Sequence, residues 1–194
     1  INEIGFDTYQ KILNEAIEEL KEKEFKDLYK EDLTKPKQYV KDITIDTDFE
    51  LLFPDDYINN ITERLNLYTQ LNNIKTEDEL KQFESEIIDR FGDLPTQVVD
   101  LLNSLKVKWV ATNLGLEKIV MKHNKLVGYF ISDQQSPFYQ SNHFTRILDY
   151  IQNNPTACKM KEKHTRSGLR LLLTFENISS IENALNALEK IDKF

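Results

Sequence analysis

The stretch TEDELKQFESEIIDRFGDLP, residues 76–95, constrains the fold more than any other because it marks both ends of a helix. Thr76 can cap the first free amide groups, and Glu79, three residues later, completes a capping box. Gly92 is placed for a left-handed C-terminal cap, and Pro95 suits the first turn of a following helix. The stretch therefore predicts one helix with defined ends and a second helix directly after it.

Apolar residues recur at steps of three and four along this helix and predict one buried stripe. The stripe consists of Leu80, Phe83, Ile87, Ile88 and Phe91. At about 100° per residue, five polar residues fall together on the opposite face. They are Glu79, Gln82, Glu86, Asp89 and Asp93. A solvated surface is the commoner role of such a face, and contact with a basic partner is the alternative.

The composition is typical of a chain that builds a core and stays in water. Of 194 residues, 40% are hydrophobic and 30% charged, and no apolar run approaches the roughly 20 residues that span a bilayer. The single cysteine, Cys158, excludes an internal disulfide and fits a reducing compartment. A start at Ile1 suggests a piece of a longer protein. We expect a cytoplasmic location and no membrane partner.

Charge is distributed unevenly along the chain. The net charge is -8, but acidic residues outnumber basic ones only up to residue 116, and basic residues prevail in 117–194. A net charge of this sign argues against a chain whose main role is to hold a phosphate backbone. It favours a protein partner with a basic face for the acidic part of the chain.

Periodicity predicts an α+β fold with one small, mostly antiparallel sheet and helices packed on it. A separate amphipathic helix, 6–23, comes first, followed by a charged linker that ends at Pro36. The predicted order is then a strand in 39–52, helices from Asn60, from Thr76 and over 95–113, a hairpin over 118–132 turning at 123–125, a helix from Ser136 to Ile151, a hairpin over 157–175, and a helix capped by Ser179. We accordingly expect two parts, 1–36 and 37–194.

Catalytic motifs are not found in the sequence. The five glycines are scattered, so no phosphate loop of the Walker type is present. His123, His143 and His164 lack partners at metal-ligand spacing. Asp55 and Asp56 follow a proline and precede a helix, where turn and capping roles are the usual ones. We expect no enzyme activity, metal site or cofactor in this chain.

Lysines alternate along one predicted strand and therefore project from one of its faces. Lys159, Lys161 and Lys163, with Arg166 and Arg170, could form a basic patch that touches nucleic acid. The sequence shows no aromatic residues interleaved with them for stacking on bases, and a row of lysines also protects a sheet edge. Nucleic-acid binding through this hairpin is the alternative function, and we do not expect DNA contact to be the main role.

Five blocks of the chain together resemble the C-terminal (TRCF) module of the bacterial transcription-repair coupling factor, Mfd. Each block is ordinary by itself, but the series keeps the family's order and nearly its spacing. The blocks are IGFDTYQKILNEAIEELK (4–21), LFPDDYI (52–58), ERLNLYTQLNNIKTEDEL (63–80), EIIDRFGDLPTQVVDLL (86–102) and LGLEKI (114–119). Beyond Ile119 the similarity lies in the pattern of elements more than in residues.

The resemblance implies a non-catalytic regulatory domain. In that family the segment like 4–21 closes a DNA-translocating motor, which uses ATP and Mg²⁺, and the C-terminal module packs on a UvrB-like N-terminal module. That contact covers the surface that UvrA needs, in a protein that also acts on stalled RNA polymerase. The expected partners are thus the UvrB-like module directly and UvrA and RNA polymerase through the parent protein.

Glu86 and Asp89 are our candidates for the residues that make this contact. They lie three apart on the face opposite the apolar stripe and within EIIDRFG, the block closest to the family pattern. We expect them to pair with arginines of the UvrB-like module, because a guanidinium can hold a carboxylate by two hydrogen bonds. Gln82 and Asp93 extend the same predicted surface.

Overall fold

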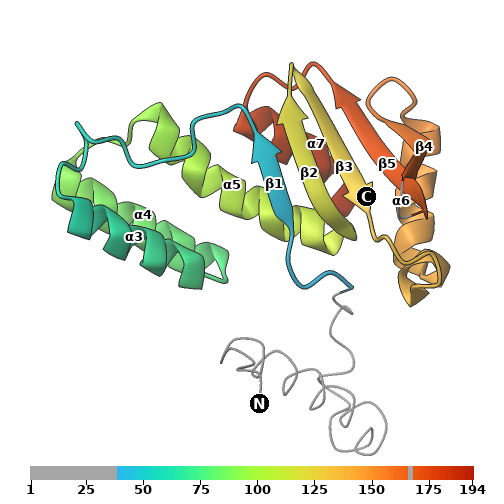
Figure 1. The fold of residues 1–194 in the computed structure, drawn as a ribbon, viewed down its shortest axis with the longest axis horizontal. Helices are drawn as coiled ribbons and strands as arrows, with labels where there is room; N and C mark the ends of the chain where they lie inside the picture. The colour runs from blue at the N-terminus through green and yellow to red at the C-terminus, as the bar shows by residue number, and fades with distance from the viewer. Residues whose placement is uncertain (1–38, 166–167) are drawn as a thin grey trace, which may run out of the picture. The chain divides into compact units, whose positions relative to one another are not determined.

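The computed structural model describes residues 39–165 and 168–194, in which five strands form one mixed sheet (Figure 1). The strands are β1 (Thr44–Thr47), β2 (Leu116–Lys122), β3 (Lys125–Phe130), β4 (Lys159–Thr165) and β5 (Gly168–Glu176), in the order β1-β2-β3-β5-β4. β1 runs parallel to β2, and the other neighbours are antiparallel. The α+β class and the mostly antiparallel sheet are confirmed. The predicted helix 6–23 and its linker lie outside the described residues.

Helices cover one face of this sheet and extend beyond it. They are α3 (Ile61–Asn73), α4 (Glu77–Phe91), α5 (Thr96–Asn113), α6 (Asn142–Asn153) and α7 (Ile181–Asp192), with the short 3-10 helix η1 (Pro137–Gln140) before α6. In Figure 1, α5 and α7 lie behind the strands, whereas α3 and α4 form a pair beyond the sheet. The opposite face of the sheet carries none of the described helices.

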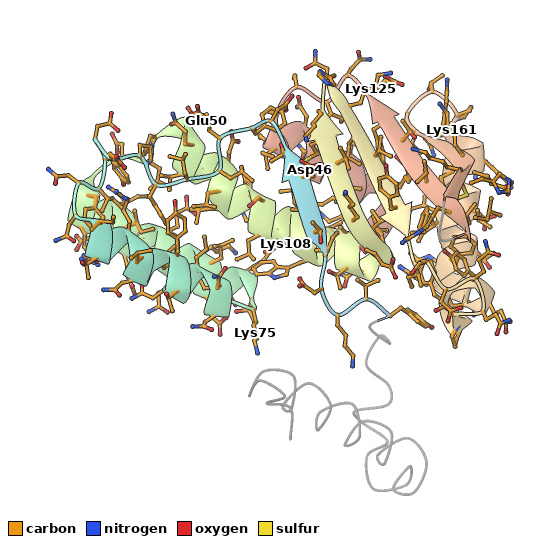
Figure 2. The ribbon with its side chains drawn as sticks, in the orientation of Figure 1. Asp46, Glu50, Lys75, Lys108, Lys125 and Lys161 are labelled. Carbon is orange, nitrogen blue, oxygen red and sulfur yellow. The ribbon has the colours of Figure 1, made fainter. Side chains whose placement is uncertain are left out.

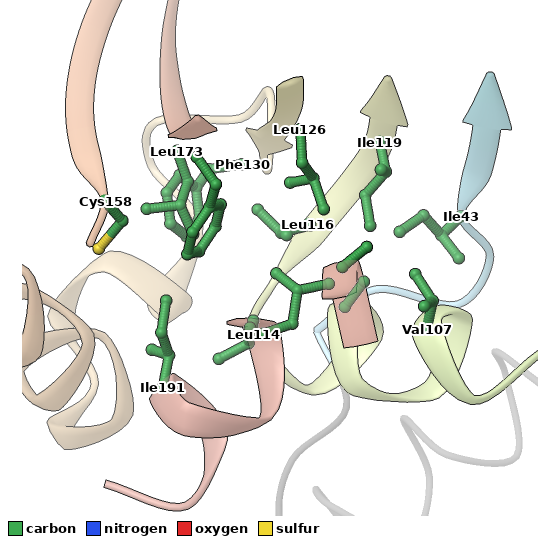
Figure 3. Packing of buried hydrophobic residues seen from close by; sticks show 14 of the residues in the cluster. Ile43, Val107, Leu114, Leu116, Ile119, Leu126, Phe130, Cys158, Leu173 and Ile191 are labelled. Carbon is green, nitrogen blue, oxygen red and sulfur yellow. The ribbon is translucent and has the colours of Figure 1, made fainter. Parts of the chain in front are cut away.

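Helix α5 joins two apolar clusters. Its first half contributes Val98 and Leu102 to a cluster with the apolar faces of α3 and α4. Its second half contributes Val107 and Ala111 to the main core between the sheet and the helices, part of which is seen in Figure 3. The helix pair is therefore attached to the sheet through a helix that belongs to both cores.

Both ends of α4 fall where the sequence predicts, but the C-terminal cap is not the predicted left-handed one, because Gly92 has ψ -163°. Pro95 precedes α5 as its N-cap residue instead of lying in its first turn. The Thr76 hydroxyl accepts a hydrogen bond from the Glu79 amide, and the Glu79 carboxylate accepts one from the Thr76 amide, which makes a complete capping box. Gly92 ends the helix with φ 87° and donates its amide hydrogen to Ile88. The capping box and glycine stop therefore act as local sequence signals that tertiary packing does not override.

One apolar residue of α4, Ile88, was wrongly predicted as part of the buried stripe, and two apolar residues of α3 are also exposed. Leu80, Phe83 and Ile87 are buried, but Ile88 is 42% exposed. In α3, Ile61 and Leu65 are 64% and 60% exposed. A two-helix pair resting on one end of α5 buries only a narrow stripe of each helix, so apolar residues at its margin stay in water.

The first strand is much shorter than predicted. Alternation suggested a strand in 39–52, but only Thr44–Thr47 pair with β2. Side chains turn the backbone at both ends, because Asp42 accepts from the Ile43 amide and Thr47 from the Phe49 amide. The apolar residues on either side, such as Val40 and Phe53, are buried although they belong to no strand.

Three predicted boundaries differ in ways that follow from local hydrogen bonding. The first hairpin turns on two residues, His123 and Asn124, whose φ values of 53° and 58° fit a type I′ turn, instead of on three. The helix predicted from Ser136 is divided into η1 and α6, because Ser141 caps a new start. Ser180, and not Ser179, caps α7.

Candidate interaction surface

The acidic face of α4, defined as Gln82, Glu86, Asp89 and Asp93, is exposed along its whole length. The buried side chains of Leu80, Phe83 and Ile87 point into the helix pair and fix the orientation of α4. The Gln82 amide donates to the Glu86 carboxylate at 3.0 Å, which orders part of the face without neutralising it. All four predicted residues are therefore open to solvent, three of them on α4 and Asp93 in the turn after it.

The nearest cation on α4 is engaged elsewhere. Arg90 lies four residues after Glu86, a spacing that allows an ion pair within the helix. Its guanidinium instead contacts Glu63 of α3, with 2.6 Å between Nη2 and Oε1, and lies over the ring of Phe91. Within the described residues, Glu86 and Asp89 have no ion-pair partner.

Glu63 was missed by the sequence reasoning, although it decides the charge of the face. It occupies a different helix, and nothing in the spacing of α4 reveals that it takes Arg90. A contact between residues so far apart in sequence has no local signal. Only the antiparallel packing of α3 against α4 brings the two side chains together.

The C-terminal end of α4 is held in place by an aromatic residue from the preceding loop. The Tyr57 hydroxyl donates to the Gly92 carbonyl at 2.8 Å, and its ring packs against Phe91. Burial, with a smaller contribution from the Asp93 carboxylate, raises the pKa of Tyr57. Asp93 thus lies on an anchored turn.

Glu79 belongs to the helix cap instead of the acidic face. Its carboxylate accepts from the backbone amides of Lys75 and Thr76 at 2.8 and 3.2 Å. These two hydrogen bonds, the first being the larger cause, lower the pKa of Glu79. The carboxylate is therefore already bonded within its own chain and is not counted among the docking residues.

The basic residues of the second hairpin are only partly available. Lys159, Lys161 and Lys163 are exposed on β4, as the alternation predicts. Arg170 instead pairs with Glu117, 2.8 Å away, and also donates to the Phe130 carbonyl. Arg166 lies outside the described residues. A patch limited to this hairpin is thus a row of three lysines.

Residues with reactive side chains have structural roles in the described part of the chain. Cys158 is buried, which raises the pKa of its thiol to about 11. His143 Nε2 lies 2.7 Å from the Asn113 carbonyl and ties α6 to the end of α5. Among residues 39–165 and 168–194, no cluster of three metal-ligating side chains occurs, and no helix is long and apolar enough to span a bilayer.

Three comparisons bear on the family. Residues 47–141 match the family model of the TRCF domain. The chain is 28% identical over 162 residues to the transcription-repair-coupling factor of Rickettsia bellii, covering 83% of this chain and 13% of that protein. It is 29% identical over 132 residues to that of Staphylococcus aureus strain USA300, covering 68% and 10%.

A crystal structure described as the C-terminal domain of transcription-repair coupling factor shares the fold. Its TM-score with this chain is 0.56 at 21% sequence identity, and the match covers 78% of this chain and 94% of that one. The chain therefore shares the α+β fold of that solved domain, and its residues 47–141 are similar to the TRCF domain family. The similarity to transcription-repair-coupling factors extends over 10–13% of the length of those two proteins.

Proposed function

We propose that this domain is a non-catalytic regulatory module whose acidic α4 face binds an arginine-bearing surface of a UvrB-like module in the same parent protein. This contact covers the surface that UvrA needs and keeps the parent protein inactive until its motor works on DNA. The activity of that parent, as an ATP-driven translocase that meets stalled RNA polymerase, is part of the same proposal.

The observation that supports this proposal most strongly is the pairing of Arg90 with Glu63. It leaves Glu86 and Asp89 as two adjacent, solvent-facing carboxylates on a helix whose orientation is fixed by burial. Leaving water costs a carboxylate several kcal/mol, and bidentate hydrogen bonds from guanidinium groups can offset this cost. A basic surface on the partner would also be attracted by the acidic charge of the first part of this domain.

Replacing Glu86 and Asp89 together with alanine separates this proposal from a merely solvated face. In the isolated chain we expect little change in thermal stability, because exposed charges without partners contribute under about 1 kcal/mol. In the full-length protein we expect tighter UvrA binding and higher ATPase activity, because removing one member of a desolvated interfacial pair costs about 2–5 kcal/mol. UvrA affinity by calorimetry and steady-state ATPase rates provide the measurements.

Asp149→Ala with Glu162→Ala is the matched control. It removes two exposed carboxylates from α6 and β4, so the net charge changes equally, and UvrA affinity should stay at the wild-type level. If Glu86→Ala with Asp89→Ala also keeps the wild-type affinity, the α4 face is not the docking surface.

A further inference from the structure

The open face of the sheet gathers basic residues from three strands around an apolar centre. Cross-strand partners project to the same side of a sheet, so the pairing register identifies this face. One transverse row reads Thr44, Lys118, Tyr129, Leu172 and Lys161, from β1 to β4. The next reads Asp46, Val120, Val127, Thr174 and Lys159. The sequence could not show these rows, because they combine strands that are far apart along the chain.

Lysines without ion pairs flank the apolar centre on two sides. Within the described residues, Lys122 pairs with Asp46 and Lys125 with Glu176. None of the other four, Lys118, Lys159, Lys161 and Lys163, forms an ion pair with a carboxylate of the described residues, although Lys118 is close enough to Asp46 to help lower the pKa of that carboxyl. All four are exposed, and in Figure 2 Lys161 lies on the strand at the sheet's outer side. This part of the face is positively charged although the chain carries -8 overall.

Tyr129 supplies the aromatic ring that the β4 lysine row lacks. It lies on β3, the middle strand, between Lys118 on one neighbour and Leu172 on the other. Leu172, its cross-strand partner on β5, is only 8% exposed, whereas Tyr129 is half-buried and belongs to neither apolar core. Lys161 is two strands from Tyr129, about 10 Å at the usual strand spacing, and lies in the same transverse row.

We propose that this open sheet face binds single-stranded nucleic acid. Tyr129 stacks on a base, and Lys118 on one side and the row Lys159, Lys161 and Lys163 on the other hold phosphates. Lysine is depleted at protein–protein interfaces, and the exposed apolar area here is small, so an acidic protein is the less suitable partner. Proteins that bind single strands combine a positively charged surface with aromatic side chains on which bases stack, and this face offers one such ring between lysines. The site is independent of the α4 face.

Fluorescence anisotropy of the whole chain with a labelled oligothymidylate tests the proposal. We expect binding to weaken about 20- to 50-fold between about 50 and 200 mM salt, as three or four phosphate contacts require. Lys118→Glu with Lys161→Glu should lower affinity at least about tenfold and flatten the salt dependence. Lys75→Glu with Lys190→Glu, which makes the same charge change before α4 and on α7, should alter affinity by no more than about twofold.

Substitutions of Tyr129 test the stacking separately from the charge. Tyr129→Leu keeps an apolar side chain in the sheet but removes the ring, and should weaken binding about 5- to 150-fold. Tyr129→Phe keeps the ring and should stay within about twofold. Thermal melting of both variants shows whether the sheet is intact, so that a loss of affinity in a folded Tyr129→Leu variant reports on stacking.

Four results would overturn the proposal. One is no binding at low salt, and a second is an equal loss in the Lys75 and Lys190 control. A third is a duplex that binds as tightly as the single strand and is unaffected by Tyr129→Leu. The last is labelled polyglutamate that binds as tightly as the oligothymidylate and whose binding is unchanged by Tyr129→Leu. That result would make the face a docking surface for acidic proteins.

Discussion

At the scale of single residues, the charge of the candidate docking face depends on which carboxylate holds Arg90. Glu86 is four residues away on the same helix, but Glu63 on α3 takes the guanidinium at 2.6 Å. Both side chains of that pair are partly in water, so the pair contributes under about 1 kcal/mol to folding. Its larger effect is to leave Glu86 and Asp89 without a cation.

Asp192 gives a residue-scale prediction about pH. Burial at the end of α7 raises the pKa of its carboxyl, against smaller opposing effects of His143 and a hydrogen bond from Asn113. The folded state therefore holds this proton more tightly than the unfolded state, and stability falls as pH rises from the unfolded to the folded pKa. We expect Asp192→Asn to raise the melting temperature at neutral pH, with a gain that shrinks as pH falls through the folded pKa.

Thermal melting across the acid range measures this difference between Asp192→Asn and the wild-type chain. The side-chain amide introduced by this substitution can still accept from Asn113, so the main change is the removal of a partly buried charge. Asp149→Asn, which changes an exposed carboxylate on α6, is the control and should not raise the melting temperature. A gain that is the same at every pH would assign the effect to packing instead of titration.

At the scale of elements, two glycines with positive φ are required for different reasons. Gly92 ends α4 with φ 87° and ψ -163°, a region that only glycine adopts readily, although a Cβ there would meet no atom within 4 Å. At Gly115, between α5 and β2, φ is 74° and a Cβ would lie 2.3 Å from Cζ of Phe138, which is fully buried.

We therefore expect Gly92→Ala to cost about 1–3 kcal/mol of unfolding free energy from backbone strain alone. Gly115→Ala should cost more, because about 1–3 kcal/mol of overpacking against Phe138 adds to a similar strain. Urea unfolding of the two variants and the wild-type chain gives the order directly. Equal losses would mean that the Phe138 ring moves aside at no cost.

At the scale of the whole molecule, local signals were predictable from the sequence and long-range pairings were not. The cap at Thr76, the stop at Gly92 and the stripe of Leu80, Phe83 and Ile87 follow from neighbouring residues, and all are found. The fold class also followed, because each strand and helix after residue 113 has its own periodicity. These features need no knowledge of what packs against them.

The features that were missed depend on partners distant in sequence. The length of β1 is set by where the chain leaves β2, and Ile88 is exposed because α3 and α5 cover only part of α4. The row that joins Lys118, Tyr129 and Lys161 exists only through the strand order. The four predicted site residues are all exposed, and the experiment on Glu86 and Asp89 tests whether a partner binds there.

The last prediction concerns the division of the chain into 1–36 and 37–194. Residues 39–194 form one compact unit, and α5 contributes to both apolar cores described in it, so these residues should unfold in one transition. A chain of residues 37–194 should then melt within a few degrees of the 194-residue chain, with a single calorimetric peak.

Limited proteolysis of the longer chain should cut first between Glu22 and Pro36, where large apolar residues are few. An early cut within 60–113, or a shorter chain that melts much lower, would show that residues 1–36 are part of the same folded unit.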